Sequence, residues 1–94
     1  MSDETRRSVE AVLYSEAVLN SLAAIEHERW AHWQKYLHEQ CEPQDDGSLR
    51  IPAELVARWK RQLETPFAEL PDSEQESDRE QVLRYLPTVV DVLS

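Results

Sequence analysis

The first 42 residues contain neither glycine nor proline, and this constrains the fold more than any other feature of the sequence. The stretch is rich in Ala, Leu, Glu and Arg, which favour helix, so it predicts helix as far as about Cys41. One straight helix of that length would measure ~58 Å, whereas a compact chain of this size has a diameter of ~32 Å. We therefore expect that the helix breaks where cap-competent residues lie, near Tyr14–Ser15 or Asn20–Ser21, or that it protrudes and is covered by another subunit.

The remainder of the chain holds its one glycine and five prolines. Residues 41–48 include Pro43, Gly47 and two adjacent aspartates, and they predict an exposed loop. Pro52 then suits the first turn of a middle helix that extends to about Glu64. This helix would bury an apolar stripe with one residue every four positions, at Leu55, Trp59 and Leu63.

The segment 65–71 contains two prolines and predicts an ordered connector rather than helix. A final helix opens at residues 71–73, where Ser73 and Glu76 have the spacing of a capping box. We expect Pro87 to bend or restart this helix. The predicted fold class is all-α: a small helical bundle of a long N-terminal helix, a middle helix and a C-terminal helix, joined by a proline-rich connector.

Composition excludes several classes of function. The chain has 94 residues, 19 acidic against 10 basic side chains and a formal net charge of −9, which argues against non-specific binding of DNA or RNA. No apolar run approaches the ~18 residues of a membrane span, and the first residues lack the apolar core of a signal peptide. With a single cysteine, no internal disulfide can form, so we expect a cytoplasmic protein that contacts no membrane.

Charge is nevertheless uneven along the chain. Residues 49–68 carry four basic against two acidic side chains, whereas residues 69–94 carry seven acidic against two basic ones. If an anionic ligand binds, we expect it near residues 49–68, against the sign of the whole chain.

Neither a metal site nor a catalytic site is predicted. His27 and His32 are five residues apart, about 140° around a helix, so they cannot ligate one ion together. His38 and Cys41 share a face but have no second pair of ligands. We find no nucleophile beside a base, no phosphate loop and no acid–base couple, and therefore predict a non-enzyme without a cofactor.

The aromatic residues allow two interpretations. Trp30, Trp33 and Tyr36 recur every third position of the first helix, and Trp59 and Phe67 follow later in the chain. They could fill the core of a small bundle. Alternatively, with arginine and lysine side chains between them, they could stack a base and hold phosphates.

Two segments together resemble the ryanodine-receptor-type (RyR) domain, in its small stand-alone bacterial or phage form. Residues 25–30, Ile-Glu-His-Glu-Arg-Trp, are similar to the family's I-x-H-E-x-W. Residues 65–79 are similar to its V-P-Y-x-E-L-P-x-x-E-x-x-x-D-R, with Phe67 in place of tyrosine. The central G-W-x-Y-G segment of the family is missing, and Trp59 is the aromatic residue that could substitute for it.

The resemblance implies a non-catalytic module, residues 17–94, that binds a nucleotide-derived signal such as an adenine nucleotide, an ADP-ribose-like molecule or a cyclic nucleotide. Sequestration of that signal in phage–host conflict is one hypothesis. The ligand-binding residues it implies, with Trp59 added, are His27, Trp30, Trp59, Phe67, Asp78 and Arg79.

An alternative function is a protein-interaction or assembly factor without a small ligand. Residues 1–16 form an extension that precedes the RyR-like part and carries apolar residues on one side. So short an amphipathic segment cannot fold alone, and it favours pairing with another subunit. A homo-oligomer is therefore expected under either hypothesis.

Overall fold

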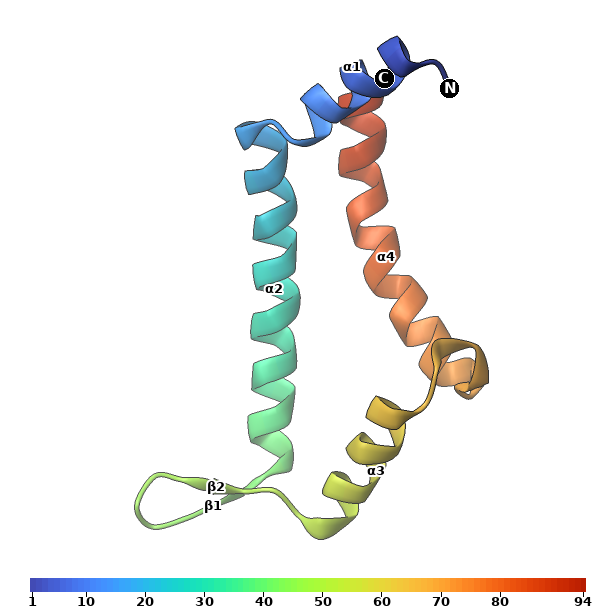
Figure 1. Cartoon of the computed structure of the whole chain (residues 1–94). Helices are drawn as coiled ribbons and strands as arrows, with labels where there is room; N and C mark the ends of the chain where they lie inside the picture. Colours follow the sequence, from blue (N-terminus) through green and yellow to red (C-terminus); the bar gives the residue numbers. More distant parts are fainter. The chain divides into compact units, whose positions relative to one another are not determined.

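The computed structural model describes all 94 residues and is all-α, as predicted. It contains four α-helices, one short 3-10 helix and one two-stranded sheet (Figure 1). The residues group into two compact units. Unit 1 comprises Met1–Arg29 and Arg79–Ser94, and unit 2 comprises Trp30–Asp78.

The glycine-free N-terminal stretch forms two helices, α1 (Asp3–Leu13) and α2 (Glu16–Gln40), with a break at Tyr14–Ser15. The Ser15 hydroxyl makes this break. It donates a hydrogen bond to the Val12 carbonyl at 2.6 Å and accepts one from the Val18 N–H at 3.5 Å, so it closes α1 and caps α2. The prediction of a break near Tyr14–Ser15 is confirmed.

The alternative break at Asn20–Ser21 is wrong, because both residues lie inside α2. The Ser21 hydroxyl donates to the Ala17 carbonyl, one turn earlier, at 3.0 Å. A serine that bonds backwards in this way remains within a helix instead of capping a new one.

The predicted loop after Cys41 contains a small hairpin that the sequence did not indicate. Strands β1 (Glu42–Pro43) and β2 (Leu49–Arg50) pair antiparallel, with Glu42 opposite Arg50. Gly47 has a φ of +87°, in the left-handed region that glycine adopts without strain, and this lets the chain reverse. Two-residue strands are too short to show any alternation. Residues 42–51 are exposed, as expected for the loop, but Cys41, the first residue of the predicted loop, is buried.

The middle helix α3 spans Ala53–Glu64, which confirms its predicted extent. Two details differ. Pro52 precedes the helix as its N-cap rather than lying in its first turn. Leu55 is buried and Trp59 half-buried, but Leu63 is 85% exposed. Because each step of four residues advances about 40° around a helix, Leu63 lies about 80° from Leu55 and leaves the buried side.

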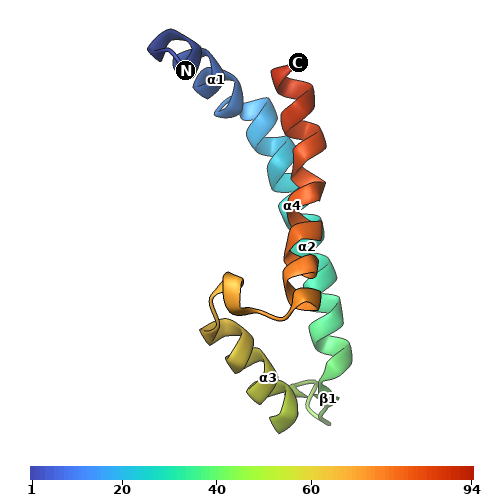
Figure 2. The same cartoon turned by 90° about the vertical axis from the view of Figure 1, so that its right-hand side faces the viewer.

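The connector is ordered as predicted and contains a short 3-10 helix, η1 (Phe67–Glu69). The last helix, α4 (Asp72–Leu93), starts after Pro71, whose carbonyl accepts the N–H groups of Glu74 and Gln75 at 3.0 Å each. Ser73 is therefore inside the helix and not at the N-cap position that the predicted capping box requires. No second helix starts at Pro87 either, because this residue lies inside α4. Figure 2 shows α4 as one continuous helix.

Very little of the chain is buried. The buried apolar residues are Val18 in unit 1 and Cys41 and Leu55 in unit 2. Seventeen large apolar side chains are exposed. None of the helices is both long enough and apolar enough to cross a lipid bilayer.

Candidate functional site

The six predicted ligand residues are divided between the two units. His27 and Arg79 belong to unit 1, whereas Trp30, Trp59, Phe67 and Asp78 belong to unit 2. Trp59 is half-buried and the other five are exposed. Trp30 and Phe67 are each about half exposed, so packing in the core does not fully account for either ring.

Unit 2 contains an aromatic cluster centred on Trp33. The Trp33 ring lies 5.6 Å from that of Trp59 in an edge-to-face arrangement, and 5.4 Å from that of Tyr36 in a tilted one. These separations are in the range where aromatic pairs attract each other. Trp33 belongs to α2 and Trp59 to α3, so their contact holds part of α2 against α3, and both tryptophans have a structural role. The spacing of Trp33 and Tyr36, three residues apart, already indicated that their rings lie close together, but Trp33 was not predicted as a site residue.

Beside this cluster an open hollow of about 220 Å³ lies along α2, lined by His32, Lys35, Tyr36 and Glu39. Tyr36 is common to the cluster and the hollow. The lining therefore combines an aromatic ring, a cationic amine, an imidazole and a carboxylate. A ring and a cation side by side are suited to a flat, anionic ligand.

The connector is held by the start of α4. The Gln75 amide donates hydrogen bonds to the carbonyls of Phe67, at 3.0 Å, and Ala68, at 3.3 Å. Glu74 accepts a hydrogen bond from Gln62 of α3 and pairs with Arg61 at 3.4 Å. These contacts fix the Phe67 backbone while its ring stays exposed. Glu74 and Gln75 lie within residues 65–79, so this segment carries residues that order the connector.

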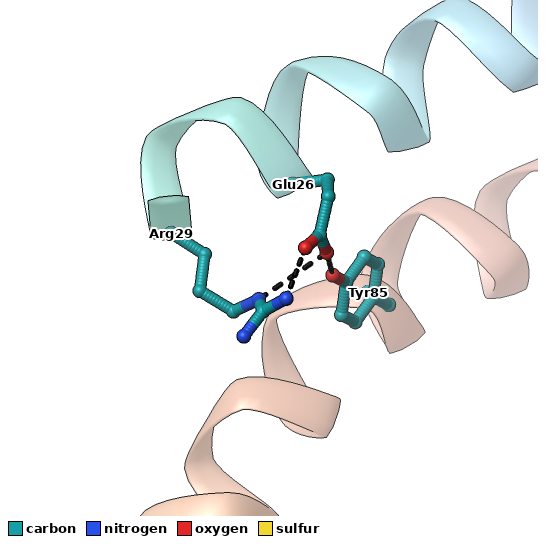
Figure 3. Close-up of polar contacts among 3 residues, drawn as sticks. All are labelled: Glu26, Arg29 and Tyr85. Atoms are coloured by element: carbon teal, nitrogen blue, oxygen red, sulfur yellow. Dashed lines mark hydrogen bonds and ion pairs between the residues drawn. The ribbon is translucent and has the colours of Figure 1, made fainter. Parts of the chain in front are cut away.

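Unit 1 contains a polar cluster that sequence reasoning missed (Figure 3). Glu26 of α2 accepts hydrogen bonds from the Arg29 guanidinium and from the Tyr85 hydroxyl of α4. The neighbouring Glu28 pairs with Arg84 at 3.4 Å. The Glu26–Arg29 spacing of three residues was visible in the sequence, but no local pattern could identify a tyrosine 59 positions away.

The hydrogen bonds of this cluster shift the pKa values of its three members. The hydrogen bond from Arg29, and after it that from Tyr85, lowers the pKa of Glu26 below its ordinary value of 4.5. The hydrogen bond with Glu26 raises the pKa of Arg29, and donation to the Glu26 carboxylate likewise raises the pKa of Tyr85 above 10.0. At neutral pH the cluster is therefore a carboxylate, a guanidinium and a neutral phenol. A phenol with a raised pKa is a poor general base, so the cluster is suited to joining α2 to α4.

Comparison of the chain with protein-family models, with curated proteins and with solved structures finds no match. No group of three or more His, Cys, Asp or Glu side chains is placed to hold a metal ion.

Proposed function

We propose that this chain is a protein-interaction module that assembles with further copies of itself. The observation that carries the proposal is the contrast between three buried apolar residues and seventeen exposed large ones. Soluble monomers rarely leave apolar surface exposed on this scale, and contiguous exposed patches mark sites where proteins associate.

The physical reason lies in the size of the chain. A chain of about this length buries only about 60–65% of the surface that its unfolded form exposes, which leaves a thin margin of stability. Each exposed Val, Leu or Phe that becomes fully buried contributes about 1.5–3 kcal/mol. Contacts between copies would supply the burial that each chain lacks alone, so folding and assembly should be coupled.

Sedimentation velocity over a wide range of protein concentration tests the proposal. We expect the mass to rise from 11.0 kDa to a multiple of it, and the melting temperature to increase with concentration. The high net negative charge makes copies repel each other, so added salt should strengthen the association. A chain that stays monomeric at millimolar concentration, with a melting temperature independent of concentration, would refute self-assembly.

A second candidate function is binding of a nucleotide-derived ligand by a stand-alone RyR-type domain. The observation that favours it is the hollow in unit 2, where Lys35 and Tyr36 lie beside the Trp33–Trp59 pair. The motif-bearing residues 65–79 support the same candidate through the resemblance stated above.

Thermal-shift measurements with ADP-ribose, ATP and cyclic AMP test this candidate. A ligand present at about 100 times its dissociation constant stabilises the folded state by about 2.7 kcal/mol. We expect the shift to disappear in Lys35→Gln and Trp30→Ala. Lys60→Gln is the matched control, because Lys60 is also an exposed lysine of unit 2 but does not line the hollow. If none of the three ligands stabilises the protein at millimolar concentration, this candidate is eliminated.

A further inference from the structure

The aromatic cluster of unit 2 has the geometry of a corner. The rings of Trp33 and Trp59 meet at 66° with their centroids 5.6 Å apart, so they are closer to perpendicular than to parallel. The Tyr36 ring also lies against that of Trp33, tilted by 33°. Trp33 is 43% exposed and Tyr36 is 37% exposed, whereas Trp59 is half-buried. Much of Trp33 and Tyr36 therefore remains accessible to a ligand.

A carboxylate lies beside this cluster. Glu39 and Tyr36 both line the hollow of about 220 Å³. Lys35, one helical turn before Glu39, lines it as well, but the two side chains form no salt bridge with each other. Both are exposed, and the flexible stem of a lysine can keep its ammonium group in water. The Glu39 carboxylate is therefore available to an incoming cation.

The charge of unit 2 favours a cation over an anion. The unit carries eleven acidic against five basic side chains. Two of the basic side chains, Arg50 and Arg61, are paired with carboxylates of the same unit, which leaves nine acidic and three basic side chains outside these two pairs. A field of this sign raises the local concentration of cations and opposes the approach of anions. The surroundings of the aromatic cluster therefore suit a positively charged ligand.

We infer that the aromatic cluster and Glu39 bind a methylated ammonium group, carried by a choline-like small molecule or by a trimethylated lysine side chain. The face of an aromatic ring attracts a cation that lies within about 6 Å of the ring centre, and several rings around one cation are the usual means of recognising a quaternary ammonium. The methyl groups contact apolar ring surface, and the Glu39 carboxylate balances the charge. An unmethylated ammonium is strongly hydrated, so it should bind more weakly.

Titration with choline tests the inference. The matched neutral probe is the alcohol in which a tert-butyl group replaces the trimethylammonium group, because the two molecules have the same shape. In nuclear magnetic resonance spectra we expect choline to shift the indole N–H signals of Trp33 and Trp59 in a saturable way, with an affinity at least tenfold above that of the alcohol. Equal affinities would mean that the hollow accepts any small apolar group, and would overturn the inference. Absence of saturation at tens of millimolar choline would overturn it as well.

Variants of the lining residues locate the site. Glu39→Gln should weaken choline binding at least threefold and leave binding of the neutral alcohol unchanged. Glu64→Gln is the matched control, because Glu64 is also an exposed glutamate of unit 2 but does not line the hollow. Tyr36→Leu removes an exposed ring and should weaken choline binding too, with circular dichroism as the check that each variant is folded. If Glu39→Gln and Tyr36→Leu both bind choline as tightly as wild type does, the inferred site is wrong.

Lys35→Gln separates this inference from the nucleotide candidate. A cationic ligand is repelled by Lys35 and should bind more tightly once that charge is removed, whereas an anionic ligand loses an attractive partner. Weaker choline binding in Lys35→Gln would contradict the inference. The site needs only one copy of the chain, so these measurements have the same meaning whether or not the protein assembles with itself.

A pair of peptides distinguishes the two sources of the ligand. One peptide carries a trimethylated lysine and the other carries the same lysine without methyl groups. Tighter binding of the trimethylated peptide than of choline would identify a modified protein as the ligand, and the reverse order would identify a small molecule. Equal binding of the two peptides would contradict recognition of the methylated ammonium group.

Discussion

The phenol of Tyr85 donates a hydrogen bond to the carboxylate of Glu26, which lies 59 residues earlier in the chain and on a different helix. The pKa of Glu26 is lowered in the folded state and that of Tyr85 is raised. A lowered carboxylate pKa contributes stability that is lost as the pH falls through the folded value, below about 4.5. A raised phenol pKa contributes stability that is lost as the pH rises above about 10.

The first prediction is that Glu26→Gln lowers the pKa of Tyr85, because the negative charge that opposes phenolate formation is removed. The change is measured by titrating the near-ultraviolet absorbance of the phenolate. Tyr85→Phe identifies which of the three tyrosine transitions belongs to Tyr85. An unchanged Tyr85 midpoint in Glu26→Gln would show that the two side chains are not bonded in solution.

The second prediction concerns two glutamines of α4 with opposite environments. The Oε1 atom of Gln81 is buried without a hydrogen-bond partner, whereas the Gln75 amide donates to two connector carbonyls. Replacement of an unsatisfied buried amide by an apolar side chain of similar size removes a desolvation cost. We expect Gln81→Met to stabilise the protein by about 1 kcal/mol, and Gln75→Met to destabilise it by about 1 kcal/mol.

Urea unfolding at one fixed protein concentration measures both changes, because assembly also affects apparent stability. The two variants introduce the same residue into the same helix, so each is a control for the other. Equal effects on stability would contradict the assigned difference in hydrogen bonding.

The third prediction concerns the break between the first two helices. Ser15→Ala removes the side chain that caps α2 and should cost about 1 kcal/mol. Ser21→Ala replaces a serine inside α2 with a better helix former and should be neutral or slightly stabilising. Thermal unfolding of both variants provides the comparison, and a larger loss at Ser21 would disprove the capping role of Ser15.

The fourth prediction concerns Gly47 in the hairpin. A Cβ added there would meet no atom within 4 Å, so any cost comes from the positive φ alone. Gly47→Ala should destabilise by about 1 kcal/mol, and Gly47→Asn by less, because asparagine tolerates the left-handed region better. Hydrogen exchange of the Gln44 amide, which bonds to the Ser48 carbonyl at 2.8 Å, should accelerate more in Gly47→Ala.

Local features of the sequence predicted the helices well. The stretch without glycine or proline became α1 and α2, and Ser15 marked their boundary. A helix end was predicted wrongly where a pattern pointed to one residue but a neighbouring residue made the hydrogen bonds instead. Ser73 has the spacing of a capping box, but the carbonyl of Pro71 accepts the first helical N–H groups, so the helix begins ahead of Ser73.

The candidate sites were less predictable, because they depend on contacts between distant segments. The Trp33–Trp59 pair and the Glu26–Tyr85 bond each join two helices, and no spacing within one helix reveals such a partner. The exposure of the apolar residues of α4 was also hidden. Tyr85, Val89 and Val92 are half-buried whereas Val82, Leu83 and Leu86 are exposed, and hydropathy alone does not distinguish the two sets.

The division of the chain into two units has a spectroscopic consequence. All three tryptophans and the single cysteine belong to unit 2, whereas unit 1 contains neither residue type. Tryptophan fluorescence and the rate at which a thiol reagent modifies the buried Cys41 therefore report on unit 2 alone, and circular dichroism reports on the helices of both. Coincident transitions by these probes would mean that the units unfold as one cooperative system, and a separate helical transition would give the stability of unit 1 without any engineered label.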